Sequence, residues 1–201
     1  MRGELKAAAR TVSAFALGIT LGVIFRPSPG AVLPYAYAFL YIVVATAGVY
    51  VGMSWRRLLR AGRRIFALGM AFVGSAIIGD VVAGAPVAYL LGLPMTLTMA
   101  ASLGSGWYSF TGPFLSLLSP FMGVIGFVAN QLREDLTLAL FPLLYRVIGE
   151  GSVVMGGATT MDTTLGVITR YGGAEVGLEG LVQGVVLTLL IPVLLPLVVR
   201  L

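Results

Sequence analysis

The chain has 201 residues, of which 58% are hydrophobic and only 10% are charged, and its mean hydropathy is +0.99. Soluble domains average about 25% charged residues, so this composition excludes an ordinary soluble domain and favours a polytopic helical membrane protein. Cysteine and histidine are both absent, which excludes disulfides, thiolate metal sites and histidine acid–base chemistry. The net charge of +5 comes mainly from arginines in one loop, so we interpret it as a signal of membrane orientation and expect no nucleic-acid partner.

Long apolar segments predict five membrane-spanning helices, at about residues 7–25, 35–54, 65–91, 120–146 and 176–199. Two further segments, 95–119 and 152–170, are broken in the middle by glycine-rich sequence, and each is expected to form a re-entrant hairpin or a broken helix. Non-helical backbone at membrane depth is tolerated only where it lines a cavity within the protein. The sequence therefore predicts one all-α transmembrane domain over residues 1–201, in which residues 65–199 resemble an inverted repeat.

The densest run of charge predicts the orientation of the chain. Arg56, Arg57, Arg60, Arg63 and Arg64 lie within nine residues, as is typical of a cytoplasmic loop. We therefore expect the N-terminus in the cytoplasm and the C-terminus outside. If both broken segments are re-entrant, Arg146 and Arg170 also lie in the cytoplasm, whereas two full crossings would place Arg146 outside. The positive-inside rule favours the re-entrant arrangement.

The segment 120–146 carries polar residues in the middle of an apolar helix. At 100° per residue, Asn130, Arg133 and Glu134 share an arc of about 100° with three small residues, Gly123, Gly126 and Thr137. Each ionisable group near the bilayer midplane costs about 2.5–3.5 kcal/mol, so this stripe must face a partner or a water-filled cavity.

The intramembrane ionisable residues are the first candidates for function: Asp80, Arg133, Glu134, Asp135 and Asp162. A buried ion pair that fixes helix packing, for example between Arg133 and Asp135 or Asp162, is the alternative interpretation. Glu134 lies on the small-residue face beside Asn130, where a carboxylate suits a proton carrier or a binder of ammonium groups.

The two glycine-rich breaks supply further candidates. The first, Gly104–Gly112, contains Trp107, Tyr108 and Ser109, whose aromatic faces could hold a cation. The second, Gly156–Thr164, is dense in oxygen ligands, with Thr159, Thr160 and Thr163 around Asp162. Ordinary core aromatics at the first break and a helix-capping Asp162 at the second remain the alternatives. We expect no catalytic residue, metal site or cofactor.

Three motifs together resemble the LysO-type L-lysine exporter family: Gly106-Trp-Tyr-Ser109, Leu132-Arg-Glu134 with the following Pro142, and Gly157-Ala-Thr-Thr-Met-Asp-Thr-Thr-Leu165. The resemblance covers nearly the whole chain. It implies an inner-membrane exporter of L-lysine, and of its analogue thialysine, driven by antiport with protons. It also implies that the glutamate important for export in this family falls on Glu134.

The resemblance also bears on partners. Longer members of the family begin with further helices that contribute another intramembrane acid, and the family pattern has Asp where this chain has Asn130. We therefore expect either a homo-oligomer or a separately encoded small membrane subunit, in contact with membrane lipid. The competing hypotheses are a non-transporting assembly subunit and, remotely, an intramembrane aspartyl protease, which needs two carboxylates that share a proton.

Overall fold

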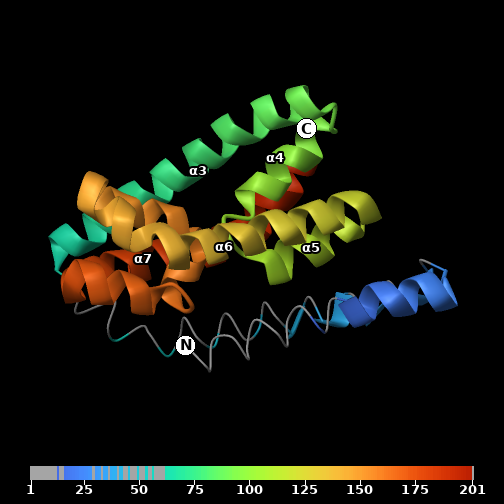
Figure 1. Cartoon of the computed structure of the whole chain (residues 1–201), viewed down its shortest axis with the longest axis horizontal. Helices are drawn as coiled ribbons and strands as arrows, with labels where there is room; N and C mark the ends of the chain where they lie inside the picture. The colour runs from blue at the N-terminus through green and yellow to red at the C-terminus, as the bar shows by residue number, and fades with distance from the viewer. Residues whose placement is uncertain are drawn as a thin grey trace. The chain divides into compact units, whose positions relative to one another are not determined.

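The computed structural model describes residues 16–28 and 62–200 continuously. It also describes residue 13 and, between the two ranges, single residues and short runs. All regular structure in these described residues is helical, which confirms the all-α class (Figure 1). The chain divides into two compact units, residues 1–39 and residues 40–201. Within the first unit, residues 16–25 form an apolar helix, and residues 26–28 follow it without regular structure. Most of the predicted helix 35–54, the N-terminal ten residues and part of the arginine loop lie outside the described residues.

Three long apolar helices form the frame of the second unit. They are α3 (Arg63–Leu91), α6 (Pro120–Ile148) and α7 (Leu165–Val199), and each is long and apolar enough to cross a membrane. Their ends follow from local sequence. Gly92 stops α3 in the left-handed conformation, whereas the Ser119 hydroxyl caps the start of α6, with Pro120 at its first position.

The first hairpin lies between α3 and α6. It consists of α4 (Met95–Leu103) and α5 (Tyr108–Ser116), joined by residues 104–107, which we call the first tip. Both Ser105 and Gly106 have positive φ there, at 50° and 90°. This reversal interrupts the helix, so the backbone enters from one end of the unit and returns to it, within the segment predicted to be broken over 95–119.

The second hairpin occupies residues 149–172. The 3₁₀ helix η1 (Gly149–Met161) is interrupted at Gly157, and residues 165–172, the first part of α7, return toward the starting end. We call residues 156–164 the second tip. Gly173, at φ 85° and ψ 177°, then breaks α7, so that the long final helix begins at residue 174. The sequence analysis places the break at 152–170 and the final helix at 176–199.

The hairpins enter from opposite ends of the second unit, and α6 runs past both (Figure 1). Around α4 and α5, the core is formed by small and branched residues, among which Ala100, Leu115, Ile191 and Leu195 are fully buried. A second cluster, around Phe141, Val153 and Ile168, lies where the second hairpin packs. The outer faces of the long helices carry exposed apolar side chains such as Ile78, Val82, Leu132, Leu136 and Val193, as lipid-facing helices do.

Candidate functional site

The tips of the two hairpins touch. The Ala158 N–H donates a hydrogen bond to the Ser105 carbonyl oxygen over 2.8 Å, and this bond joins the second tip to the first. Gly157 makes the approach possible, because a Cβ placed on it would lie 2.1 Å from the same Ser105 oxygen. Its backbone, at φ 56° and ψ −127°, is also one that only glycine adopts readily. Two breaks about 50 residues apart in sequence therefore form one structure.

Asn130 of α6 holds the first tip in place. It is buried, its Oδ1 accepts the Gly106 N–H over 2.7 Å, and its Nδ2 donates to the carbonyls of Ala101 and Gly126, each over 2.8 Å. These three bonds use the oxygen and both amide hydrogens of the side chain. Asn130 therefore acts in this conformation as a clamp on the first tip, on the arc of α6 where the sequence analysis places it.

Arg133 holds the second hairpin. Its guanidinium donates to the carbonyls of Met155, over 2.8 Å, and Val154, over 3.2 Å, and forms an ion pair with Asp80 of α3. Arg133 therefore does form an ion pair that fixes helix packing, as one interpretation of the sequence expects. Its partner, however, is Asp80, 53 residues away, and not Asp135 or Asp162. The ion pair lies at a cavity of about 490 Å³ between α3 and α6, lined mainly by apolar residues.

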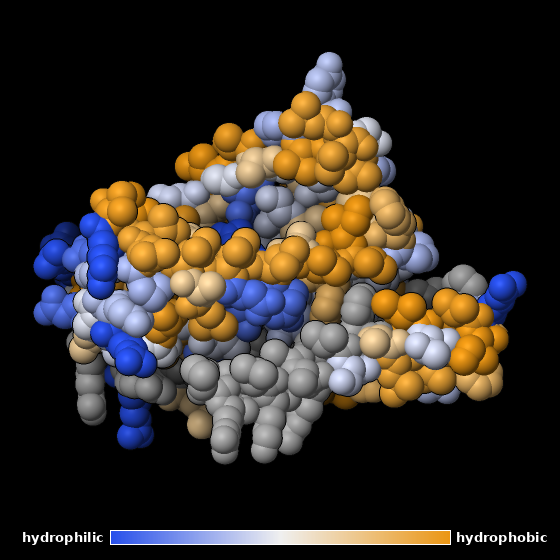
Figure 2. All heavy atoms as spheres, in the orientation of Figure 1, coloured by the Kyte–Doolittle hydropathy of each residue, from blue (hydrophilic) through white to orange (hydrophobic). Residues whose placement is uncertain are grey.

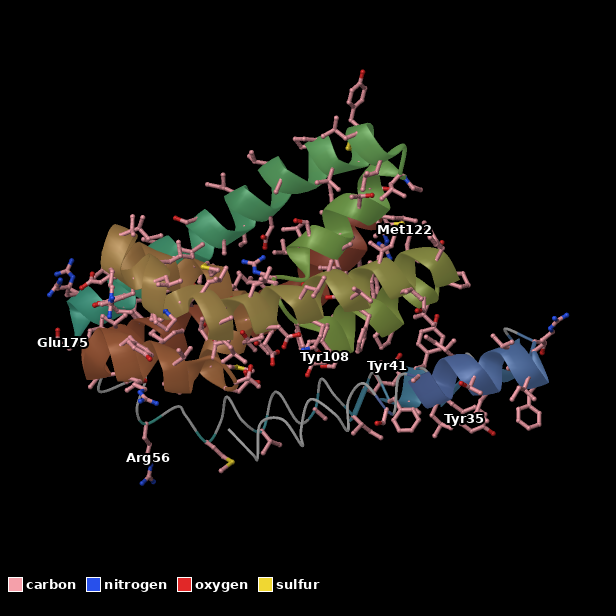
Figure 3. All side chains as sticks on the ribbon, in the orientation of Figure 1. Tyr35, Tyr41, Arg56, Tyr108, Met122 and Glu175 are labelled. Atoms are coloured by element: carbon pink, nitrogen blue, oxygen red, sulfur yellow. The ribbon has the colours of Figure 1, made fainter. Side chains whose placement is uncertain are left out.

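Glu134 lies one position farther round α6 and is buried, with 7% of its surface exposed. The Thr163 hydroxyl donates to Asp162 Oδ1 over 3.3 Å, and both residues are close enough to the Glu134 carboxylate to interact with it electrostatically. Tyr108 of the first hairpin is in electrostatic range of Glu134, Asp162 and Asp135. Figure 3 shows Tyr108 in the middle of the unit, near α6.

This group of side chains, Tyr108, Glu134, Asp162 and Thr163, is what we call the acidic site. Asp162 and Thr163 are exposed and Tyr108 is half-buried, so the site opens to the surface while Glu134 forms its buried part. The ion pairs of the described residues join Arg133 to Asp80 and Arg64 to Glu150, and neither pair includes Glu134 or Asp162. Among the described residues, the two carboxylates of the acidic site therefore have no basic partner, and the site is suited to a cationic ligand.

The remaining sequence candidates lie around this site in different roles. Asp135 is exposed and accepts a hydrogen bond from Gln131 over 3.3 Å. Trp107 stacks on Phe110 with ring centroids 4.9 Å apart and packs against the core, as the core-aromatic interpretation expects. Ser109 is half-buried on α5.

The threonines of the second tip bind backbone within the protein. The Thr159 hydroxyl donates to the Gly156 carbonyl over 2.8 Å. That of Thr160 lies 2.8 Å from the Gly157 carbonyl and 2.6 Å from the Gly180 carbonyl of α7. Asp162 accepts the N–H of the next residue, Thr163, at the start of the returning helix. Thr159 and Thr160 therefore shape the tip, whereas Thr163 faces Glu134.

Sequence reasoning missed two residues behind the second tip. Gln183 of α7 is buried and donates to the carbonyls of Val153, over 3.1 Å, and Gly157, over 3.0 Å. Glu179, one turn earlier, is also buried, with 2% of its surface exposed. The sequence signal that could have identified them is their spacing, because Glu179 and Gln183 are polar residues at i and i+4 in a mostly apolar helix.

Comparison with known proteins identifies the family. The model of the family described as "Lysine exporter LysO" matches residues 12–199. The chain is 32% identical over 188 residues to a Haemophilus influenzae protein named "Putative lysine exporter", and this match covers 92% of the chain and 94% of that protein. The chain belongs to the LysO lysine exporter family.

The second relative adds a difference in length. The chain is 30% identical over 193 residues to the lysine exporter LysO of Escherichia coli K12, across 96% of the chain but only 62% of that protein. No solved structure matches the chain. The LysO match includes α3, α6, α7 and both hairpins, so the touching tips and the acidic site lie within the part that defines the family. The chain is thus a membrane protein of a transporter family.

Proposed function

We propose that this chain exports L-lysine, with thialysine as a second substrate, in exchange for protons. The observation that carries the proposal is the acidic site, in which two carboxylates without a described basic partner lie beside the junction of two broken helices. Broken helices meeting near the middle of a membrane domain are where secondary transporters bind small charged substrates. The family and its Escherichia coli member are described as lysine exporters, which supports lysine as the substrate.

The acidic site matches the two positive charges of lysine. Glu134 and Asp162 each receive one ammonium group, and the Thr163 hydroxyl and the Tyr108 ring border the same space. Asp135, exposed one position beyond Glu134, adds negative charge at the entrance.

The substrate carboxylate is received by the start of α7. This helix begins at Leu165, two positions after Thr163, and the first turn of a helix presents N–H groups without intrahelical partners. Arg133 is the other cation nearby, but its guanidinium already binds Asp80 and two carbonyls. We therefore assign the carboxylate to the helix end and give Arg133 the task of holding the second hairpin.

Glu134 couples export to the proton gradient. An ionised carboxylate binds an ammonium group and a protonated one does not, so proton entry at Glu134 releases lysine. The neighbouring Asn130 and Thr137 cannot make this switch because neither titrates. Glu134 is also the buried member of the acidic site, so its charge depends most on what occupies the site.

The charge distribution supports insertion in the inner membrane with the N-terminus in the cytoplasm. Arg63 and Arg64 at the start of α3, Arg146 near the end of α6 and Arg170 in the returning part of α7 lie at the end of the second unit where η1 starts, whereas Arg200 lies at the opposite end. Figure 2 shows that hydrophilic atoms gather at the end where η1 starts. The positive-inside rule assigns the arginine-rich end to the cytoplasm. The C-terminus is then outside, and the hairpins enter from opposite sides of the membrane.

The exposed acidic surface requires a cover within the membrane. Asp135, Asp162 and Thr163 are exposed in the second unit, and lipid cannot satisfy such groups. We propose that a second copy of the chain or a small membrane subunit covers them.

The proposed function is tested with the purified protein in proteoliposomes loaded with labelled L-lysine. We expect efflux that is accelerated by an inward proton gradient and competed by thialysine but not by L-glutamate or L-leucine. Lysine efflux at the same rate with and without the proton gradient refutes the coupling of export to proton entry. A well-folded protein that moves no lysine under either condition refutes lysine export and favours the assembly-subunit hypothesis.

A further inference from the structure

A second buried carboxylate, distinct from the acidic site, lies behind the second hairpin. Glu179 of α7 is 2% exposed, and its Oε2 has no hydrogen-bond partner among the described residues. An ionised carboxylate left without hydrogen bonds in a protein interior is prohibitively costly, and such a group neutralises instead. The burial and the missing partner therefore both require something that binds this oxygen.

The nearest complement lies one helical turn farther along α7. Gln183 is fully buried, and its side-chain oxygen Oε1 also has no partner in the part of the chain that the structure describes. Residues at i and i+4 lie on the same face of a helix, so two acceptor oxygens without a donor face the same region. A proton on Glu179 Oε2 would give both oxygens a hydrogen bond, because a carboxylic acid can donate its O–H to the amide oxygen of Gln183.

Gln183 connects this pair to the second tip. Its Nε2 donates to the carbonyls of Val153 and Gly157, on either side of the bend in η1. Gly157 is also the residue against which Ser105 of the first tip packs. Any change in the hydrogen bonding of Gln183 is therefore passed directly to the contact between the two tips.

We propose that Glu179 is a second proton-binding site of this protein, and that through Gln183 its protonation fixes the second tip against the first. In the conformation described here Glu179 holds the proton and donates it to Gln183 Oε1. When the proton leaves, the carboxylate loses that bond and repels the amide oxygen, so the second tip is released. Glu179 is thus a positioning residue that acts through Gln183, while Glu134 contacts the substrate.

The proton has a short route to the arginine-rich end of the unit. The charged groups that face Glu179 are Glu150 of η1, Arg64 of α3 and Glu175 of α7. Arg64 and Glu150 are 3.9 Å apart, and both are exposed there. Glu175 lies at this end in Figure 3. Arg64 and Glu150 are the two of these groups that link the buried site to water, whereas Gly69 and Val182 pack closely where α3 meets α7.

The test compares Glu179→Gln with the matched control Glu175→Gln, an exposed acid one turn earlier on the same helix. Glutamine keeps a donor for Gln183 but carries no exchangeable charge. We therefore expect Glu179→Gln to keep its thermal stability and lysine–lysine exchange in proteoliposomes and to lose acceleration by a proton gradient, with Glu175→Gln unchanged. Retained acceleration overturns the coupling, and loss of exchange together with stability shows a merely structural residue.

A second measurement is independent of the substrate, because only the coupling to transport rests on the proposed function. Infrared spectra of the purified protein at neutral pH should show the C=O stretching band of a protonated carboxylic acid. The component of this band that belongs to Glu179 should be lost in Glu179→Gln, whereas the spectrum of Glu175→Gln should match that of the wild type. Identical bands in the wild type and Glu179→Gln overturn the proton site, whatever the protein transports.

Discussion

The contact between the two tips depends on a single hydrogen atom in place of a side chain, at Gly157. In Gly157→Ala, the new Cβ would lie 2.1 Å from the Ser105 carbonyl oxygen and 2.8 Å from its Oγ. Non-bonded carbon and oxygen atoms stay about 3.3 Å apart or more, so the tips must separate by about 1 Å. The hydrogen bond from Ala158 to Ser105, now 2.8 Å long, cannot survive that separation.

The energetic cost has two parts. A buried N–H left without a partner costs about 1–3 kcal/mol. Holding alanine at φ 56° and ψ −127° costs a further 1–3 kcal/mol, on the order of other rarely populated backbone conformations. We therefore expect Gly157→Ala to lower the free energy of unfolding by about 2–6 kcal/mol and to abolish export, because the second tip carries Asp162 and Thr163.

The assay is denaturant unfolding in detergent micelles combined with lysine efflux. The matched control is Gly74→Ala on α3, where a Cβ would meet nothing within 4 Å and alanine should be neutral or stabilise the helix by about 0.5–1 kcal/mol. If Gly157→Ala is as stable and as active as Gly74→Ala, the direct contact between the tips is not required and this reasoning is wrong.

Three further predictions address the clamps, the ion pair and the topology. Asn130→Ala removes three buried hydrogen bonds, one of them to the first tip, and should lower the free energy of unfolding by at least about 1–3 kcal/mol, measured in micelles. Asp80→Leu should cost about 3 kcal/mol because it strands the Arg133 charge, and the double variant with Arg133→Met should recover part of this loss in a double-mutant cycle. In Cys-scanning of intact cells, Gly151→Cys should be labelled from the cytoplasmic side and Leu118→Cys from outside; the reverse pattern contradicts the proposed orientation.

Much of the fold could be predicted because the signals are local. The apolar lengths of α3 and α6, the glycine-rich breaks and the polar arc of α6 all follow from periodicity and composition. Of that arc, Gly123, Gly126, Asn130, Glu134 and Thr137 are buried. A helix at membrane depth can hide such groups only on the side where the protein itself packs.

The choice of partners could not be predicted. Arg133 had several acids within reach in sequence, and its pairing with Asp80 depends on how α3 packs against α6, which no local pattern determines. Glu179 was overlooked for a related reason. An acid in the first half of an apolar helix, one turn after the exposed Glu175, is ordinary until the packing of η1 closes over it. The contact between Ser105 and Ala158 likewise arises only when two separate hairpins meet.

In the proposed mechanism, Glu134 binds the cationic substrate and exchanges it for a proton. The most direct test is lysine efflux from proteoliposomes containing Glu134→Gln, a change that keeps the shape of the side chain and removes its charge. We expect efflux and its acceleration by a proton gradient to be abolished in a folded protein, part of the activity to remain in Glu134→Asp, and Glu175→Gln to match the wild type. Wild-type efflux from a well-folded Glu134→Gln protein would contradict the account.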